Sequence, residues 1–438
     1  MDWEKLYKER WTTAKDAVKK VIKPGDTVVW GGGHAVQPAC DAILEVVKEG
    51  GLDNLTLEGN LMLSNPHLDD PAWAEHGARY KSIFYGGIER QGVAAGNTTY
   101  VPMVYSNMGR WYEMLQPDVG ILEMTPPDEN GMCNLGCLTP GYGSLVLSQC
   151  KHIIAGINEK LPRVNGDLQQ IPVERIDAFI ENNSDLPIYP VLRPSEIDNK
   201  ICDFILEEVP DGACLQFGFG GMPNALGYGM RVKKHLGIHT EMLTASMIDL
   251  IKEGVVDNSM KGYMPGKTVC AFTLGDQSQY DYVNNNKDCL FLPYSITNDP
   301  YNIAQNDNFV SVNNALEIDL KGAVCADTIG FRQFSGVGGQ IDFVRGATMS
   351  KGGKSFIALE STFTAKDGTK KSHIVLDLAP GAQVTTLRSE IMYVVTEYGC
   401  VNLWGQDEPT RAKLLISIAH PDFRDELTFQ AKKAGILY

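Results

Sequence analysis

The sequence predicts an α/β protein built from two related open α/β domains, each with a mainly parallel sheet and crossover helices. Two observations support this fold class. Short apolar runs with strand character alternate with helical patterns, which is typical of strand–helix–strand units. In addition, residues 23–47 and residues 209–232 resemble each other, and the length of 438 residues suits more than one domain.

The two similar segments share one order of features. Each has a proline, a Gly/Asp turn, a short apolar strand, a Gly-rich loop, a second proline and an apolar-periodic helix. Pro24 and Pro210 lie 186 positions apart, and Pro38 and Pro223 lie 185 apart. This nearly constant offset predicts a duplicated topology. Chance similarity remains an alternative, because strand, Gly-rich loop and helix often follow one another.

The strand candidates and the linker set the domain boundaries. The polar and then Pro-rich stretch ENNSDLPIYPVLRP (181–194) continues neither a helix nor a central strand. We therefore expect an N-terminal domain over 1–185 and a C-terminal domain over 195–438. The predicted strands include 119–124, 152–158, 289–294, 355–360 and 392–399.

Composition narrows the classes of partner. Hydrophobic residues make up 43% of the chain and charged residues 21%, as in a globular protein, and the formal net charge is −15. The acidic balance argues against nucleic acid or an anionic membrane surface as a partner. A ligand that carries phosphates must therefore be met by a local basic patch or by backbone amides.

The N-terminus and the cysteines bear on the compartment. The first residues contain no apolar core of a signal peptide, and no apolar run approaches the roughly 18 residues of a membrane span. The ten cysteines show no paired spacing, so we expect reduced thiols in a cytoplasmic protein. Apolar residues at helical spacing predict one amphipathic N-terminal helix: Leu6, Trp11, Ala14, Val18 and Val21.

Two Gly-rich stretches are candidates for ligand binding. QFGFGGMPN (216–224) follows an expected strand and opens an expected helix, where glycines let the backbone approach a ligand and a helix N-terminus favours an anion. It departs from the dinucleotide motif G-x-G-x-x-G, since Pro223 replaces the third glycine. The second stretch (334–355) has three basic residues nearby. Tight turns are the structural alternative for both stretches.

LGIHTEM (236–242) reads as a buried strand that ends by aiming the carboxylate of Glu241 beyond the strand. His235 and His239 lie four apart, but Gly237 and the strand-like alternation argue against a helical metal pair, so we predict no metal site. TEYG (396–399) places Glu397 at another strand end. It is a rival candidate for any carboxylate chemistry.

Seven motifs in order give the chain a family resemblance. The chain resembles family I CoA-transferases, in particular the acetyl-CoA hydrolase/transferase branch, which includes 4-hydroxybutyrate and butyryl-CoA:acetate CoA-transferases. GDTVVWGG and PPDENG extend the resemblance into the N-terminal half. The seven motifs are DGACLQFGFGGMPNAL, KHLGIHTEM, PYSITNDPYNI, NNALEIDL, QFSGVGGQIDFVRGA, VVTEYG and ISIAHPDFRDEL.

The resemblance implies roles for individual residues. Glu241 matches the glutamate that forms a covalent thioester with CoA in this family. Asn298 and the backbone amide of Gly339 match the donors to the thioester oxygen. The residues that match CoA contacts are Gln216, Phe217, Gly218, Phe219 and Gly220 in the loop, Gly339, and further along the chain Leu316 and Lys366.

The resemblance also implies the reaction. CoA would pass between short-chain acids of the acetate, butyrate or 4-hydroxybutyrate type through a glutamyl-CoA intermediate, with CoA as a substrate and no permanently bound cofactor. A homodimer or homotetramer is expected. An acyl-CoA hydrolase with the same glutamate is the nearest alternative; a nicotinamide-dependent oxidoreductase and a non-catalytic CoA sensor are more distant ones. The N-terminal loop GGGHAVQP (31–38) leaves the acyl group open.

Overall fold

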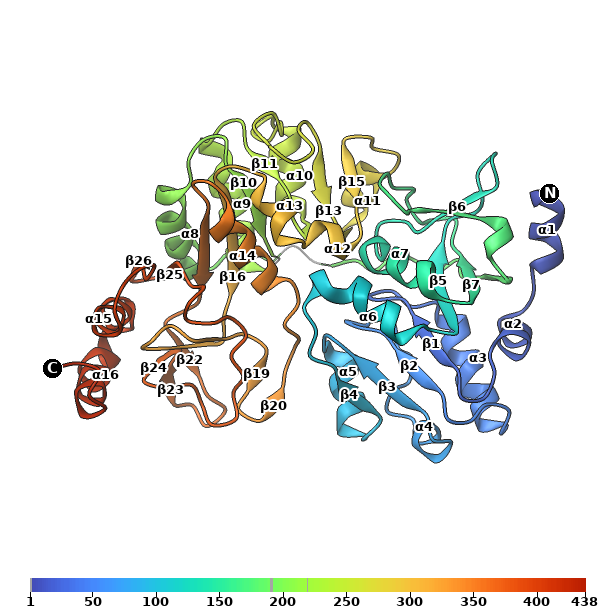
Figure 1. Cartoon of the computed structure of the whole chain (residues 1–438), viewed down its shortest axis with the longest axis horizontal. Helices are drawn as coiled ribbons and strands as arrows, with labels where there is room; N and C mark the ends of the chain where they lie inside the picture. The colour runs from blue at the N-terminus through green and yellow to red at the C-terminus, as the bar shows by residue number, and fades with distance from the viewer. Residues whose placement is uncertain (1, 190–191, 219) are drawn as a thin grey trace. The chain divides into compact units, whose positions relative to one another are not determined.

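The computed structural model describes residues 2–189, 192–218 and 220–438 (Figure 1). The chain divides into two compact units: an N-terminal unit of residues 1–189 with 269–297, and a C-terminal unit of residues 190–268 with 298–438. The first change of unit falls inside the linker that we expected at 181–194. The segment 269–297 was expected in the C-terminal domain but packs within the N-terminal unit. Backbone hydrogen bonds tie this segment to the N-terminal unit: Gly141 N–H donates to the Ala271 carbonyl at 2.9 Å, and Phe291 N–H donates to the Asn165 carbonyl at 2.7 Å.

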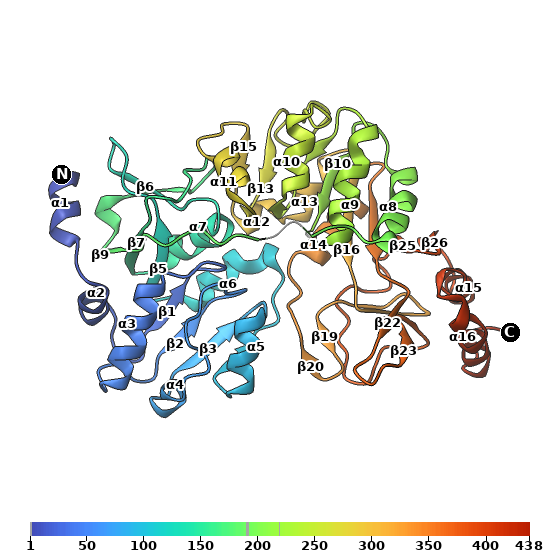
Figure 2. The same ribbon diagram turned by 180° about the vertical axis from the view of Figure 1, so that it is seen from behind.

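The N-terminal unit is built on a seven-stranded sheet in the order β4-β3-β2-β1-β5-β7-β9, and every pairing in it is parallel (Figure 2). The strands are β1 (Thr27–Trp30), β2 (Thr56–Glu58), β3 (Arg79–Ser82), β4 (Thr98–Tyr100), β5 (Val119–Met124), β7 (His152–Ile157) and β9 (Ala178–Glu181). The helices are α1 (Trp3–Arg10), α2 (Ala14–Val21), α3 (Gln37–Lys48), α4 (Ala72–Glu75), α5 (Gly87–Ala94), α6 (Met108–Leu115), α7 (Pro140–Gln149), α11 (Gln277–Val283) and α12 (Tyr294–Thr297). Two short pairs lie outside this sheet, β6 (Met132–Asn134) with β8 (Gln170–Pro172) and β13 (Thr268–Cys270) with β15 (Cys289–Phe291).

Strand β1 shows why this sheet is buried on both faces. Successive side chains of a strand point to opposite faces. Val28 and Trp30 lie in one apolar cluster, with residues of α2 and α3, whereas Val29 lies in another, with residues of α6 and α7. A strand that is covered on both faces reads as a continuous apolar run, which is how the sequence presents it.

The amphipathic N-terminal segment forms two helices, so the prediction of one helix was wrong. Thr13 ends the continuity, because its side chain accepts a hydrogen bond from Asp16 N–H and caps α2. Trp11 is extended at the end of α1, and Thr12 N–H donates to the Phe179 carbonyl of β9 at 3.0 Å. The apolar periodicity persists across the break, so it did not reveal the break.

The C-terminal unit is built on a six-stranded sheet in the order β11-β10-β16-β21-β25-β26. Only the last pairing, between β25 and β26, is antiparallel. The strands are β10 (Cys214–Phe217), β11 (Gly237–Ile238), β16 (Phe309–Asn314), β21 (Lys354–Ala358), β25 (Tyr393–Thr396) and β26 (Gly399–Asn402). The helices are α8 (Glu196–Glu208), α9 (Gly221–Gly229), α10 (Ala245–Lys252), α13 (Pro300–Ala304), α14 (Gln340–Met349), α15 (Glu408–Ile418) and α16 (Pro421–Lys433).

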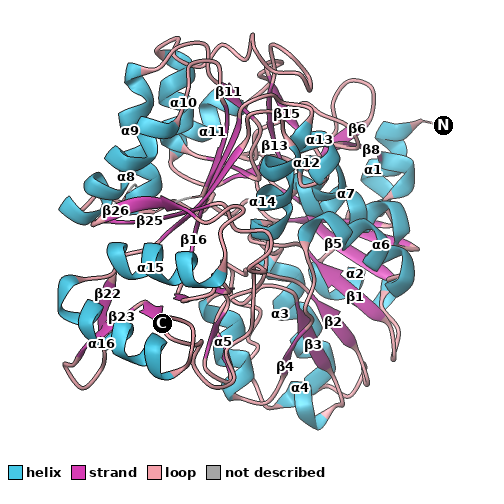
Figure 3. Cartoon of the chain, turned by 60° about the vertical axis from the view of Figure 1, so that its left-hand side comes forward, coloured by secondary structure: helices cyan, strands magenta, loops and turns pink. Residues whose placement is uncertain are grey.

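Helices cover this sheet on both sides. Helices α8 and α9 pack together on one face, and α14 packs on β16 and β21 from the other (Figure 3). Short strands follow β16 and β21 in the chain: β17 (Glu317–Asp319), β18 (Val324–Cys325), β19 (Thr328–Ile329), β20 (Arg332–Gln333), β22 (Thr362–Thr364), β23 (Lys370–Ser372) and β24 (Ile374–Val375).

The two sheets share a local strand order. Strand β1 lies between β2, the next strand in the sequence, and the later strand β5; β10 lies in the same way between β11 and β16. This agrees with the duplicated topology predicted from the two similar segments. In open α/β sheets, ligands bind beyond the carboxyl ends of the strands where the strand order reverses.

All ten cysteines are free thiols in the structure, and nine of them are buried. Over the residues described, none of the helices combines the length and the apolar character that a membrane crossing requires.

Candidate functional site

Glu241 lies just beyond the end of β11, at an edge of the C-terminal sheet. Strand β11 pairs in parallel with β10, with Cys214 opposite Gly237 and Leu215 opposite Ile238. The ladder ends at His239, whose N–H donates to the Leu215 carbonyl at 3.2 Å. Glu241 follows two residues later, before β12 (Met242–Leu243), and is partly exposed. The structure therefore places this carboxylate where the sequence predicted it, past the end of a buried strand.

Asn298 and Gly339 meet Glu241 at this point. Asn298 is fully buried, and its Nδ2 donates to Oε2 of Glu241 at 2.8 Å. Gly339 is the N-cap of α14, and a Cβ atom there would lie 2.2 Å from both Asn298 Nδ2 and Glu241 Oε2. No side chain fits at position 339 unless these two groups move. Three residues named from the sequence thus form one cluster.

The surroundings of Glu241 raise the pKa of its carboxyl to about 7. Removal from water is the largest cause, and the buried carboxylate of Asp342 in the first turn of α14 adds to it by like-charge repulsion. The hydrogen bond from Asn298 acts in the opposite direction, because it stabilises the anion. Near neutral pH the carboxylate is therefore substantially ionised and more basic than an ordinary glutamate.

The rival carboxylate, Glu397, has a different environment. It lies in the turn between β25 and β26, and both of its oxygens accept hydrogen bonds from Ser361, at 2.9 Å from the backbone N–H and 2.6 Å from the hydroxyl. These bonds hold Glu397 against the loop after β21. The geometry is that of a carboxylate which ties two strand ends together.

The Gly-rich stretch 216–220 begins with the last two residues of β10, and Gly220 is the N-cap of α9. Gln216 is buried, and its side chain exchanges long hydrogen bonds of 3.3 and 3.4 Å with Asn313 on β16. Phe217 is buried, Gly218 is partly exposed, and Phe219 lies outside the described residues. Gly220 has φ of 133° and ψ of −175°, a backbone conformation that glycine alone adopts readily, so the turn into α9 requires a glycine there.

A cavity of about 230 Å³ lies at the carboxyl ends of the central strands of the C-terminal unit. Two of the predicted CoA contacts are its neighbours in the chain, since Gly221 follows Gly220 and Ala315 precedes Leu316. Lys366 is different, because it lies in the exposed turn of the β22–β23 hairpin. The lining of the cavity includes Gly221, Met222, Pro223, Asn314, Ala315 and Glu360.

The two histidines before Glu241 do not converge on one site. His235 is exposed and pairs with Asp257 through Nδ1 at 2.7 Å. His239 is fully buried and packs edge-on against the rings of Phe309 and Phe343. This geometry does not fit the metal pair that spacing alone allowed.

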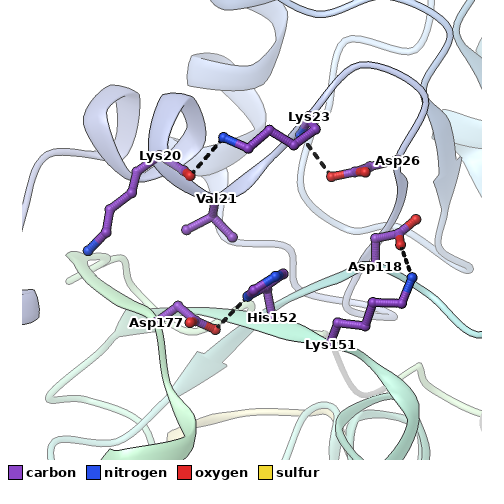
Figure 4. A pocket seen from close by; sticks show the side chains of 8 residues that line it. All are labelled: Lys20, Val21, Lys23, Asp26, Asp118, Lys151, His152 and Asp177. Carbon is purple, nitrogen blue, oxygen red and sulfur yellow. Dashed lines mark hydrogen bonds and ion pairs between the residues drawn. The ribbon is translucent and has the colours of Figure 1, made fainter.

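A second cavity, of about 340 Å³, lies in the N-terminal unit at the amino ends of the strands (Figure 4). Two carboxylates of its lining accept hydrogen bonds from backbone N–H groups at the starts of neighbouring strands. Asp118 accepts from Thr27 N–H and Asp177 accepts from Ile153 N–H, both at 2.9 Å. Asp118 also pairs with Lys151 at 2.6 Å. These charged groups have structural partners at the end of the sheet opposite to the one at which such folds bind ligands.

Three buried polar residues near Glu241 or β11 were not predicted from the sequence: Asp342, Asn258 and Lys261. Asp342 occurs in a quoted motif, but an acidic residue in a first helical turn is ordinary and gives no sign of facing Glu241. Asn258 and Lys261 lie in a polar loop, where an asparagine and a lysine are normally exposed. Only their burial in the folded chain marks them.

Comparisons with known proteins identify the family of the chain. The family model described as the acetyl-CoA hydrolase/transferase N-terminal domain matches residues 1–190, and the C-terminal domain model matches 275–431. A butyryl-CoA:acetate CoA-transferase of Anaerostipes caccae is 36% identical over 100% of this chain and 99% of its own. A 4-hydroxybutyrate coenzyme A transferase of Clostridium kluyveri is 37% identical over 99% of this chain and 100% of its own. The crystal structure of RipA from Yersinia pestis superposes over the whole of both chains with a TM-score of 0.91 and 35% identity.

Proposed function

The chain belongs to the acetyl-CoA hydrolase/transferase family and is a CoA-transferase, and from this premise we propose that it moves CoA between short-chain carboxylic acids through a thioester on Glu241. The observation that carries the proposal is the cluster in which Asn298 donates to Glu241 and Gly339 leaves no side chain between them. Acids of the acetate, butyrate or 4-hydroxybutyrate type are the proposed substrates, by analogy with the named relatives.

The proposed reaction is a double displacement with ping-pong kinetics. A Glu241 oxygen attacks the thioester carbonyl of acyl-CoA, the C–S bond breaks, and CoA thiolate and an acyl-glutamyl anhydride form. The thiolate attacks the glutamyl carbonyl carbon, and the bond between that carbon and the bridging oxygen of the anhydride breaks. The acyl group departs as a free carboxylate with that oxygen, and glutamyl-CoA remains on the enzyme. A second acid reverses these steps. The sequence of steps balances without a redox agent or a net proton.

The surroundings of Glu241 suit a carboxylate nucleophile. Carboxylates are weak nucleophiles, and partial removal from water makes this one more basic, with a pKa of about 7. Each tetrahedral intermediate carries an oxyanion, and the Asn298 amide with the backbone N–H of Gly339 would donate to it. The same water-poor surroundings would protect the anhydride from hydrolysis.

CoA itself is proposed to lie along residues 216–220 and the cavity that begins at Gly221. The glycines of the loop allow close approach of the backbone, and the wall formed by Met222 and Pro223 is apolar. Leu316 and Lys366 remain proposed contacts. The exposed position of Lys366 suits an interaction with a phosphate of the outer part of CoA. A homodimer or homotetramer and a cytoplasmic location complete the proposal.

The family description also favours a second candidate, an acyl-CoA hydrolase in which water accepts the acyl group. Both activities would use Glu241. Butyryl-CoA consumption, acetyl-CoA and free CoA measured with and without acetate separate the two activities. A transferase requires acetate and forms acetyl-CoA without net release of CoA, whereas a hydrolase releases free CoA at the same rate with or without acetate.

The proposal is tested by intact-protein mass spectrometry after mixing with butyryl-CoA, followed by borohydride reduction and peptide mapping. The expected result is a CoA adduct, or its reduced product, on the peptide that contains Glu241. The matched control is Glu241→Gln, which should give neither product. An adduct on the peptide of Glu397 would move the nucleophile there, and thioester consumption without any adduct would favour the hydrolase.

A further inference from the structure

The outer edge of β11 is held by two side chains from one loop, residues 257–267. Along this edge strand, the N–H groups of Gly237 and His239 bond to the strand next to β11, at Ala213 and Leu215. The N–H and carbonyl of Ile238 therefore face away from the sheet. Asn258 Oδ1 accepts from Ile238 N–H at 2.9 Å, and Lys261 Nζ donates to the Ile238 carbonyl at 2.9 Å.

Both side chains are buried, each with about 5% of its surface exposed. Lys261 Nζ also donates to the Lys267 carbonyl at 2.6 Å, and Asn258 Nδ2 donates to the Thr268 hydroxyl at 3.1 Å. An edge strand ordinarily leaves such groups to water, whereas burial of an ammonium group is costly. Burial of this ammonium group lowers stability, so we expect it to serve a purpose that water would not serve, such as fixing the position of β11.

Gly237 makes this arrangement possible. A Cβ atom at Gly237 would lie 2.6 Å from Lys261 Cγ, so the lysine stem passes directly over the glycine. Asn258 has φ of 57°, a left-handed conformation that asparagine tolerates better than most residues. The loop is thus shaped to bring both side chains to one residue of the strand.

We propose that Asn258 and Lys261 are positioning residues that hold Ile238, and through it the carboxylate of Glu241, at its reacting position. The inference rests on the proposed function. Only His239 and Thr240 separate the held residue from Glu241, and both are fully buried, so the short connection transmits a shift at Ile238 to the carboxylate. A displacement of about 1 Å at a reacting group costs roughly 100-fold in rate.

The test compares Lys261→Met with Lys354→Met. Lys354 offers a control from the same sheet, because it starts β21 and its Nζ donates to the Glu208 carbonyl at 2.8 Å, although it is only partly buried and also pairs with the Glu208 carboxylate. Both changes remove an ammonium group from a backbone carbonyl and should lower Tm. Lys261→Met should lower kcat about 100-fold, with the KM for acyl-CoA within about threefold, and slow formation of the Glu241 adduct by the same factor. Lys354→Met should keep kcat within about threefold. Equal effects of the two changes on kcat per folded molecule would overturn the inference.

Asn258 supplies a second test that does not depend on the folding of Lys261→Met. Asn258→Asp keeps the oxygen that accepts from Ile238 N–H, whereas Asn258→Gly keeps the left-handed backbone but removes that oxygen. The glycine variant should lose at least about tenfold more kcat than the aspartate variant. Equal kcat values for the two variants would contradict the inference. The CoA adduct on wild-type Glu241 separates failure of the positioning role from failure of the proposed function. If the wild type forms no adduct, both proposals are wrong. If the wild type forms the adduct and the variants keep their kcat, only the positioning role is wrong.

Discussion

Glu58 and Glu241 lie at or shortly past the end of the second strand of their sheets, counted along the chain, and their surroundings differ. Glu58 ends β2 and Glu241 lies just past β11, and each of these strands follows the repeated segment of its unit. Burial raises both pKa values, to about 8 for Glu58 and about 7 for Glu241. Glu58 is fully buried and accepts hydrogen bonds from the hydroxyls of Tyr112, at 2.9 Å, and Tyr142. Glu241 is partly exposed and accepts from the side-chain amide of Asn298.

Burial alone does not make a carboxylate available for catalysis. Removal from water makes each carboxyl a weaker acid. Glu58 is enclosed within the N-terminal unit by Tyr112 and Tyr142, and with a pKa of about 8 it is largely protonated at neutral pH. Glu241 keeps an open side, a donor on one oxygen and a glycine beside it. A raised pKa becomes useful for catalysis only where a substrate can reach the group.

Substitution of Glu241 itself should have the greatest effect on the rate of transfer. Glu241→Gln keeps the shape of the side chain but removes the attacking anion, so kcat for transfer should fall by at least about 1,000-fold while CoA still binds. Glu241→Asp withdraws the carboxylate by one methylene and should fall by roughly 100-fold. Steady-state assays and calorimetry with CoA measure both quantities. Substantial residual transfer in Glu241→Gln, lost on adding Glu397→Gln, would assign the role to Glu397.

The next effect concerns Asn298, the amide donor of Glu241; at Glu58 the donors are tyrosine hydroxyls. Asn298→Ala removes an amide that bonds to Glu241 at 2.8 Å, and kcat should fall roughly 100- to 1,000-fold with little change in KM. Initial rates over a range of acyl-CoA concentrations separate the two constants. A raised KM with an unchanged kcat would make Asn298 a group that binds the ground state.

A smaller effect appears in the pH dependence of kcat. Transfer requires ionised Glu241, so activity should rise with pH through about 7. Asp342→Asn removes a like charge and should lower the pKa of Glu241, which moves this rise to lower pH; loss of the Asn298 hydrogen bond should move it to higher pH. Single-turnover rates from pH 5 to 9 provide the measurement. A rise that stays in place in Asp342→Asn would show that its charge does not act on Glu241.

The smallest effect is on stability and involves Glu58. Its pKa is raised in the folded chain, so the stability it contributes is complete below the unfolded value of about 4.5 and is lost as pH rises toward about 8. Glu58→Gln stays neutral at all pH values and avoids this loss. The Tm of the variant relative to the wild type should therefore increase by several degrees between pH 5 and pH 8 and then level off. A difference in Tm that does not change with pH would mean that Glu58 is ionised in the folded protein.

The sequence predicted some strands and the residues of the candidate site, but not two features that depend on distant contacts. The strand 119–124 coincides with β5, and Glu241, Asn298 and Gly339, which the family resemblance indicated, lie together in the structure. The N-terminal helix break and the placement of 269–297 were not predicted, because a cap at Thr13 and a backbone bond to Ala271 compete with periodicity and chain order. Hydrophobic periodicity within a short stretch of sequence does not show such contacts.

Local sequence patterns suffice to predict the alternation of strands and helices, the repeated loop and the glutamates near strand ends, because these features depend on residue types within a few positions of each other. Which glutamate is exposed to a substrate and which is enclosed depends on how the chain packs. The reason is distance along the chain: the partners of Glu58 lie 54 and 84 positions away, and the partner of Glu241 lies 57 positions away. Burial and hydrogen bonding from such distant residues set the pKa and the accessibility of each carboxyl, and they exist only once the sheets and helices have packed.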